Sequence, residues 1–155
     1  MRFVIQSVTD ASVTCESGKK DSIGKGYVVL IGISDEDNEE TADRMLSKLT
    51  AMRIMKDSEG KTNLSLRDVG GSLLMISQFT LYADMRRGNR PSFAKAGAPD
   101  HASRLYDYIV MKAREAGFEV GTGVFGDHMK VTLTNDGPFT IILDSDELLK
   151  PRSLS

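Results

Sequence analysis

The sequence predicts a single α+β domain over residues 1–155, with several β-strands, two long helices and mostly antiparallel connections. Apolar or β-branched segments of strand length recur along the chain, and two other segments repeat apolar residues with the helical period. A length of 155 residues also fits one domain. No internal repeat, low-complexity tract or linker-like stretch divides the sequence.

The first half of the chain predicts three strands and then a helix. Residues 3–14 are rich in β-branched side chains, and a turn at residues 16–19 leads into a short return strand near Ile23. Residues 27–33 are continuously apolar, as in a strand covered on both faces. The acidic run over residues 35–40 suits the positive end of the helix that follows. That helix is predicted by an apolar stripe at Ala42, Met45, Leu46, Leu49 and Met52.

The second half adds strands around another long helix. A turn is predicted at residues 57–60, a buried strand over residues 72–79 and a surface loop over residues 86–97. The helix runs from about residue 100 to 116, with Pro99 near its start and Gly117 just past its end. Its apolar face consists of Ala102, Leu105, Tyr106, Ile109 and Ala113.

The chain closes with alternating residues and a predicted hairpin. Residues 129–134 alternate between apolar and polar side chains, which indicates a half-buried strand. Residues 135–138 are typical of a hairpin loop, after which the chain is expected to return through residues 139–143.

Composition limits the partners and the compartment. The net charge of −2 provides no bulk cationic field, so RNA binding would require a local patch. Cys15 is the one cysteine, which excludes an internal disulfide framework and a cysteine-based zinc site and fits a reducing cytosol. No apolar run approaches the roughly 20 residues of a membrane helix, and the N-terminus turns polar at Gln6, too soon for a signal peptide. We therefore expect a cytoplasmic protein.

Several catalytic chemistries lack their parts. The only histidines are His101, expected on the solvated surface of a helix's first turn, and His128, expected in a structural or surface role. No Gly-x-Ser-x-Gly elbow, His-Glu-x-x-His pair or Gly-Lys-Ser/Thr phosphate loop is present. The sequence therefore predicts neither a metal nor a cofactor.

Two segments together identify a family. Ser77-Gln78-Phe79-Thr80 ends an apolar strand, and Asn135-Asp136-Gly137-Pro138-Phe139-Thr140 follows later in the chain. Taken alone, the first is typical of a strand running into solvent and the second of a loop. With further matching stretches at residues 11–14, 60–64, 88–93 and 122–126, they make the chain resemble the bacterial D-aminoacyl-tRNA deacylases over essentially its whole length. The resemblance implies a barrel-like, mostly antiparallel core with two long helices.

The resemblance also implies a reaction. The family hydrolyses the ester that joins a D-amino acid to the terminal ribose of tRNA. Backbone N–H groups around Phe79 and Thr80 would stabilise the oxyanion, with Ser77 and Gln78 shaping the floor of the site. A threonine hydroxyl needs a nearby base to attack, and none is close to Thr80 in sequence. We expect attack by water assisted by the neighbouring ribose hydroxyl, with covalent catalysis by Thr80 as the alternative.

Chiral selection is implied for Asn135, Gly137 and Pro138. By resemblance, the Gly137–Pro138 peptide bond would be cis and would enter the active site of a partner subunit, which requires a homodimer with its active sites at the interface. The main-chain carbonyls of this pair would collide with an L side chain and leave a D side chain free. Glycine has no side chain to exclude, so we expect some hydrolysis of glycyl-tRNA, including glycine mischarged on tRNA(Ala).

A basic loop is the candidate contact for RNA. The expected partner is the acceptor end of aminoacylated tRNA, with no DNA and no membrane. Phosphates there could be bound by Arg86, Arg87, Arg90 and Lys95. An ordinary solvated basic loop accounts for the same four residues equally well.

Four positions depart from the family pattern. Ser7 stands where the family commonly has an arginine that helps to hold the Gly-Pro loop. Asp127 and His128 replace a small residue and a variable one, and Phe139 replaces the usual valine.

Two other classes of function stay open: a non-catalytic module that binds RNA acceptor ends, and an esterase for small D-acyl esters.

Overall fold

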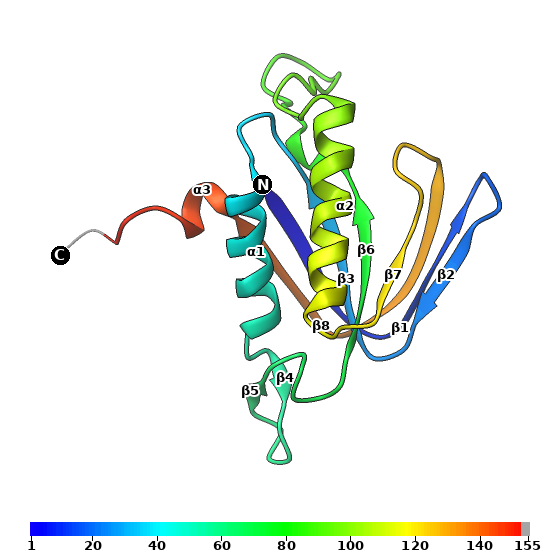
Figure 1. The fold of residues 1–155 in the computed structure, drawn as a ribbon, viewed down its shortest axis with the longest axis vertical. Coiled ribbons are helices and arrows are strands. Elements are labelled where there is room, and N and C mark those ends of the chain that lie inside the picture. The colour runs from blue at the N-terminus through cyan, green and yellow to red at the C-terminus, as the bar shows by residue number, and fades with distance from the viewer. Residues whose placement is uncertain (153–155) are drawn as a thin grey trace.

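The computed structural model describes residues 1–152 as one curved sheet covered on one face by two helices (Figure 1). A small two-stranded hairpin extends from the end of the first helix. The elements, in chain order, are β1 (Arg2–Cys15), β2 (Lys20–Ile23), β3 (Gly26–Gly32), α1 (Glu39–Ala51), β4 (Met55–Lys56), β5 (Thr62–Leu64), β6 (Ser72–Ser77), a 3-10 helix (Phe79–Tyr82), α2 (Pro99–Glu115), β7 (Val120–Thr122), β8 (Met129–Asp144) and α3 (Ser145–Leu148).

The long strand β1 organises the main sheet. It pairs antiparallel with β2, β3 and β8, and the sheet continues from β3 to β6 and β7 in parallel pairing. The resulting order is β2-β1-β3-β6-β7, with β8 on β1. Side chains join the two ends of this order, since Asp21 of β2 accepts a hydrogen bond from the Thr122 amide of β7 at 2.9 Å. The sheet is therefore a nearly closed barrel, as predicted.

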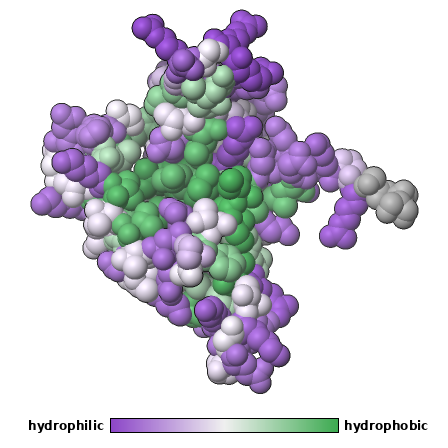
Figure 2. Space-filling model, turned by 180° about the vertical axis from the view of Figure 1, so that it is seen from behind, coloured by the Kyte–Doolittle hydropathy of each residue, from purple (hydrophilic) through white to green (hydrophobic). Residues whose placement is uncertain are grey.

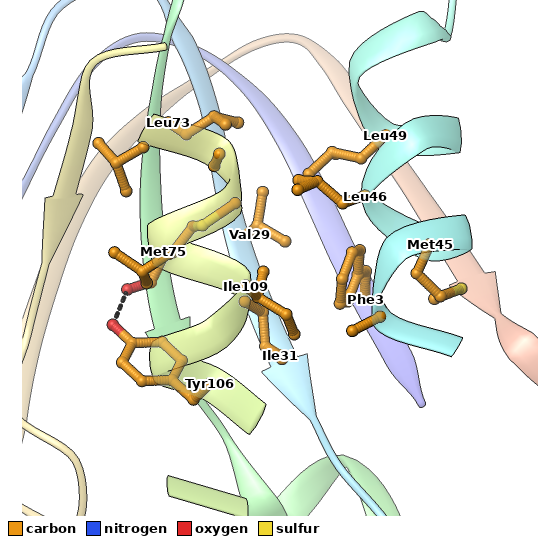
Figure 3. Packing of buried hydrophobic residues seen from close by; sticks show 14 of the residues in the cluster. Phe3, Val29, Ile31, Met45, Leu46, Leu49, Leu73, Met75, Tyr106 and Ile109 are labelled. Carbon is orange, nitrogen blue, oxygen red and sulfur yellow. Dashed lines mark hydrogen bonds between the residues drawn. The ribbon is translucent and has the colours of Figure 1, made fainter. Parts of the chain in front are cut away.

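The larger core lies between the sheet and the two helices (Figure 3). Alternate residues of β1, Phe3 and Ile5, face the helices, where the apolar stripes of α1 and α2 bury them. The hydroxyl of Tyr106 on α2 donates to the Met75 carbonyl at 2.7 Å, which ties the helix to β6. Burial raises the pKa of this tyrosine, so it stays a neutral donor.

The helix ends follow the signals in the sequence. Asn38 caps α1, its side chain accepting from the Thr41 amide at 2.9 Å. Pro99 opens α2, and Gly117 follows it with a φ of 95°, which a glycine tolerates. The acidic run before α1 also has a buried member: Asp37 accepts from the terminal amine of Met1 at 2.9 Å. No helix among residues 1–152 is long and apolar enough to cross a membrane.

Three expectations were wrong. The hairpin at residues 135–138 does not exist, because β8 continues through them along β1 as one strand from Met129 to Asp144. The strand predicted over residues 72–79 ends at Ser77, where the chain turns into the 3-10 helix. His101 is partly buried rather than fully solvated: its Nε2 is buried and has no hydrogen-bond partner within the described residues.

Candidate functional site

A largely apolar cavity of about 570 Å³ opens where β6 ends. Ser77, Gln78 and Phe79 line it, so three of the four predicted catalytic residues lie together. Phe93 and Phe125 join them from loops far away in the sequence, and the Phe79 and Phe93 rings meet edge-on with centroids 4.9 Å apart. Phe79 is 54% exposed, so an aromatic face stays open at the mouth.

The turn after β6 leaves two amides unused. The Gln78 amide donates to the Ile31 carbonyl at 2.8 Å, which fixes the start of the turn to β3. Phe79 and Thr80 open the 3-10 helix, and within residues 1–152 their amides have no acceptor. Fixed, unpaired N–H groups beside a cavity are suited to stabilise a developing oxyanion.

The neighbour of the Thr80 hydroxyl is a side-chain amide rather than a base. The Gln78 side-chain amide donates to the Thr80 hydroxyl oxygen. Among the described residues, no histidine or carboxylate is hydrogen-bonded to this hydroxyl, so nothing is placed to remove its proton.

The turn between β1 and β2 supports the opposite wall of the cavity. This wall is the segment between β7 and β8, which contributes Phe125 and His128 to the lining. Lys19 Nζ donates to Thr122 Oγ1 at 2.6 Å at one end of the segment, and the Ser17 amide donates to Asp127 Oδ2 at 3.0 Å at the other. The hydrogen bond from the Ser17 amide lowers the pKa of Asp127. This carboxylate therefore stays charged and remains an acceptor for that bond.

The predicted basic patch is partly neutralised. Arg86 forms several hydrogen bonds to Asp84, which hold the pKa of this carboxylate well below its usual range, and Lys95 approaches the same carboxylate at 4.0 Å. Arg87 and Arg90 are exposed and have no ion-pair partner within residues 1–152. They remain the free cations of the patch, on a loop that leads into Phe93.

The Gly137–Pro138 pair lies on a bulge of β8. Gln6 pairs with Thr140 and Val8 with Asn135, so residues 136–139 stand opposite Ser7 alone. The Gly137–Pro138 peptide bond is cis, as predicted, and both residues are exposed. Ser7 is buried beneath the bulge, where its hydroxyl contacts Met55 Sδ at 3.8 Å beside a cavity of about 90 Å³.

Within one chain, the bulge and the cavity at the end of β6 are apart. Ser77 on β6 pairs with Ile31 and thereby lies at the level of Phe3 on β1, whereas the bulge lies at the level of Ser7 on β8, three strands across from β6. Strand spacings put the two features roughly 20 Å apart. They also line separate cavities. The described residues of one copy therefore do not bring the two predicted parts of the site together.

The face of the sheet opposite the helices exposes apolar side chains. Leu30 and Ile142 both pair with Val4, so the three side chains form a row across β3, β1 and β8 on this face. Ile142 is 69% exposed, and Val4 and Leu30 are half-buried. Figure 2 shows apolar surface in the middle of this side. A continuous apolar patch of this kind is typical of a protein interface.

Among residues 1–152, no group of three or more histidine, cysteine or carboxylate side chains could hold a metal ion. Sequence reasoning also missed several parts of the site. Phe93, Phe125 and Lys19 reach the cavity or its wall only through the fold, although Phe93 and Phe125 lie in stretches that carry the family resemblance.

The chain is similar in sequence to proteins of one family. The sequence profile described as D-Tyr-tRNA(Tyr) deacylase matches residues 4–144. A protein named D-aminoacyl-tRNA deacylase from Bifidobacterium adolescentis is 50% identical, and the match covers 96% of this chain and 99% of that protein. The protein of the same name from Thermus aquaticus is also 50% identical, over 95% of this chain and 97% of that protein.

Solved structures show the same fold. The structure titled "c-Myc DNA Unwinding Element Binding Protein" has a TM-score of 0.86 and 36% sequence identity, covering 93% of this chain and 98% of that one. A second structure, titled a probable eukaryotic D-amino acid tRNA deacylase, has a TM-score of 0.77 at 20% identity, covering 92% and 97%. The latter similarity concerns the fold alone.

Proposed function

Because the chain belongs to the D-Tyr-tRNA(Tyr) deacylase family and is a D-aminoacyl-tRNA deacylase, we propose that it hydrolyses the aminoacyl ester in the cavity at the end of β6. The observation that carries this proposal is the pair of free amides of Phe79 and Thr80 beside that cavity. We take residues 1–155 as one deacylase domain, and we expect it in the cytoplasm, where charged tRNA is used.

The chemistry requires little from side chains. An aminoacyl ester is already activated, so stabilising the oxyanion with the amides of Phe79 and Thr80 is the main task. Ser77 and Gln78 form the floor, and a water molecule attacks with help from the ribose hydroxyl next to the ester. The ester C–O bond breaks, the ribose oxygen takes a proton, and the free amino acid leaves.

Thr80→Ala separates this route from covalent catalysis. We expect kcat/KM for D-tyrosyl-tRNA to stay within about tenfold of the parent value, since the amide of residue 80 remains in place. Loss of a true nucleophile would instead lower kcat by about 10,000-fold or more. Single-turnover rates on charged tRNA make the comparison. Thr132→Ala, an exposed threonine on β8, is the matched control.

We propose that a second copy completes the site. The bulge with Gly137 and Pro138 is exposed and lies far from its own chain's cavity, on the strand that also carries Ile142. Pairing of two copies through the apolar row of Val4, Leu30 and Ile142 would bring the bulge of each copy to the cavity at the end of β6 in the other copy. The main-chain carbonyls of Gly137 and Pro138 would then exclude L side chains, while Asn135 belongs to the same selecting element.

Two further properties follow from selection by exclusion. Glycine has no side chain to exclude, so glycyl-tRNA, including glycine mischarged on tRNA(Ala), is a side substrate. The acceptor end of the tRNA is bound by the basic loop, in which Arg87 and Arg90 supply free charges and Arg86 and Lys95 share Asp84.

One assay tests the proposal against its rivals. Purified protein is mixed with tRNA charged with D-tyrosine, L-tyrosine or glycine, and release of the amino acid is followed. Rapid release of D-tyrosine, measurable release of glycine and background release of L-tyrosine support it. No release at all indicates a module that only binds acceptor ends, and cleavage of small D-acyl esters alone indicates a small-molecule esterase. A monomer in sedimentation would contradict the shared site.

A further inference from the structure

The side chain of Asn135 spans the two ends of the β8 bulge. Its Oδ1 accepts the Phe139 amide at 2.9 Å, and its Nδ2 donates to Thr140 Oγ1 at 3.1 Å. Asn135 and Thr140 are the last residues of β8 that stay in register with β1 on either side of the bulge. One side chain therefore closes the base of the loop that presents Gly137.

Both polar groups of Asn135 are used by the protein itself. An amide side chain in this arrangement has its carbonyl and one N–H engaged within its own loop, and it points across the bulge rather than out from it. To bind the aminoacyl group through the same atoms, Asn135 would have to give up these bonds. The bonding pattern thus separates Asn135 from the exposed Gly137 and Pro138.

Little else among the described side chains holds the bulge. Within residues 1–152, Asn135 is the only side chain that is hydrogen-bonded to residues 136–139. Below them lies the cavity of about 90 Å³, and Ser7 directs its hydroxyl to Met55 rather than to the bulge. Because no other described side chain is hydrogen-bonded to residues 136–139, the polar support of the bulge comes from the bonds at its base.

We infer that Asn135, through Phe139 and Thr140, is a positioning residue for chiral selection that fixes the Gly137–Pro138 carbonyls without contacting the substrate. This inference rests on the proposed function of the bulge. A loose bulge admits L side chains that a fixed one excludes, whereas hydrolysis of the D ester depends on the partner's cavity. Loss of Asn135 therefore acts on the L substrate and leaves the D substrate nearly unaffected.

The test compares four variants as intact protein. Asn135→Ala removes both bonds, and Thr140→Val removes only the bond from Nδ2. Thr140→Ser keeps the hydroxyl, and Thr134→Val makes the valine substitution at an exposed position of β8 outside the bulge. We expect the preference for D- over L-tyrosyl-tRNA to fall about fivefold in Asn135→Ala and about twofold in Thr140→Val. Thr140→Ser and Thr134→Val should match the parent, and kcat/KM for the D substrate should stay within about twofold throughout.

Amide hydrogen exchange gives a readout that does not use activity. The Phe139 amide should exchange about tenfold faster in Asn135→Ala, while amides of β1 and β3 keep their parent rates. An unchanged D/L preference in a folded Asn135→Ala dimer would overturn the inference, as would equal losses on both substrates, which would indicate direct contact. If Asn135→Ala fails to fold, Thr140→Val against Thr140→Ser decides. Absence of any D/L preference in the parent protein would instead contradict the proposed function, and the exchange rate would then test the support of the bulge separately.

Discussion

Replacing Gly26 with alanine is expected to lower the free energy of unfolding by at least about 3 kcal/mol, a large part of the stability of a domain of this size. A Cβ atom at this position would lie 1.8 Å from the Ser72 carbonyl oxygen. Both partners are backbone, because Gly26 and Ser72 form the first pair of the parallel β3–β6 ladder. No rotation of a side chain can relieve the overlap, so the two strands must separate.

The matched control lies two residues away. Gly24 is exposed, and a Cβ atom there would meet nothing within 4 Å, so Gly24→Ala should change the stability by no more than about 0.5 kcal/mol. Urea unfolding of the two variants and the parent measures the difference. If the free energy of unfolding of Gly26→Ala lay within about 0.5 kcal/mol of the parent value, as for an ordinary surface substitution, the close approach of β3 to β6 would be refuted. Since β6 ends at Ser77, a displaced β6 should also slow ester hydrolysis.

Replacing Gly137 with alanine should lower the preference for D- over L-aminoacyl-tRNA, measured as the ratio of kcat/KM values, by at least about tenfold. This corresponds to about 1.4 kcal/mol in activation free energy. Gly137 has a φ of +141°, in a region that side-chain-bearing residues rarely adopt. Its Cβ atom would also lie 2.8 Å from the Phe139 nitrogen, the donor to Asn135. The backbone of the bulge must therefore change conformation, which changes the direction in which its carbonyl groups point.

The effect of strain alone is controlled by a second glycine. Gly60, in the turn between β4 and β5, also has a positive φ, of +77°, but a Cβ atom there would meet open space. Gly60→Ala should lower stability modestly and leave the D/L preference unchanged. Initial rates on tRNA charged with each enantiomer provide the measurement. Selection by main-chain carbonyls would be untenable if Gly137→Ala discriminated as well as the parent.

The two long helices and the longer strand segments could be predicted because local patterns determine them, whereas the short elements β4, β5, β7 and α3 were not predicted. The predicted stripes on α1 and α2 are buried except for Met52, which caps α1 and is only partly buried, and Pro99 and Gly117 bound α2. The prediction of a hairpin at residues 135–138 was wrong because a Gly-Pro pair is found both in turns and in bulges. Which one forms depends on whether β1 is long enough to pair on both sides, and here it is.

Only part of the site could be predicted from the sequence. Ser77, Gln78 and Phe79 are consecutive, so the motif that carried the family resemblance also located part of the cavity lining. Phe93 and Phe125 reach it through long-range packing, which no local pattern encodes. The support of the wall by Lys19 likewise depends on β2 and β7 meeting at the ends of the sheet.

The exposed bulge of β8 has a consequence for how the enzyme tolerates amino-acid substitutions. Where chiral selection depends on peptide groups, as proposed, exchanging an exposed side chain such as that of Asp136 leaves the selecting atoms unchanged. On that proposal, the substitutions in the loop that would reduce chiral selectivity are those that change its backbone conformation or remove the hydrogen bonds of Asn135 at its base. Under the proposed selection by main-chain carbonyls, most other substitutions in the loop would leave the discrimination between D and L substrates unchanged, so the outer surface of the loop would be free to vary.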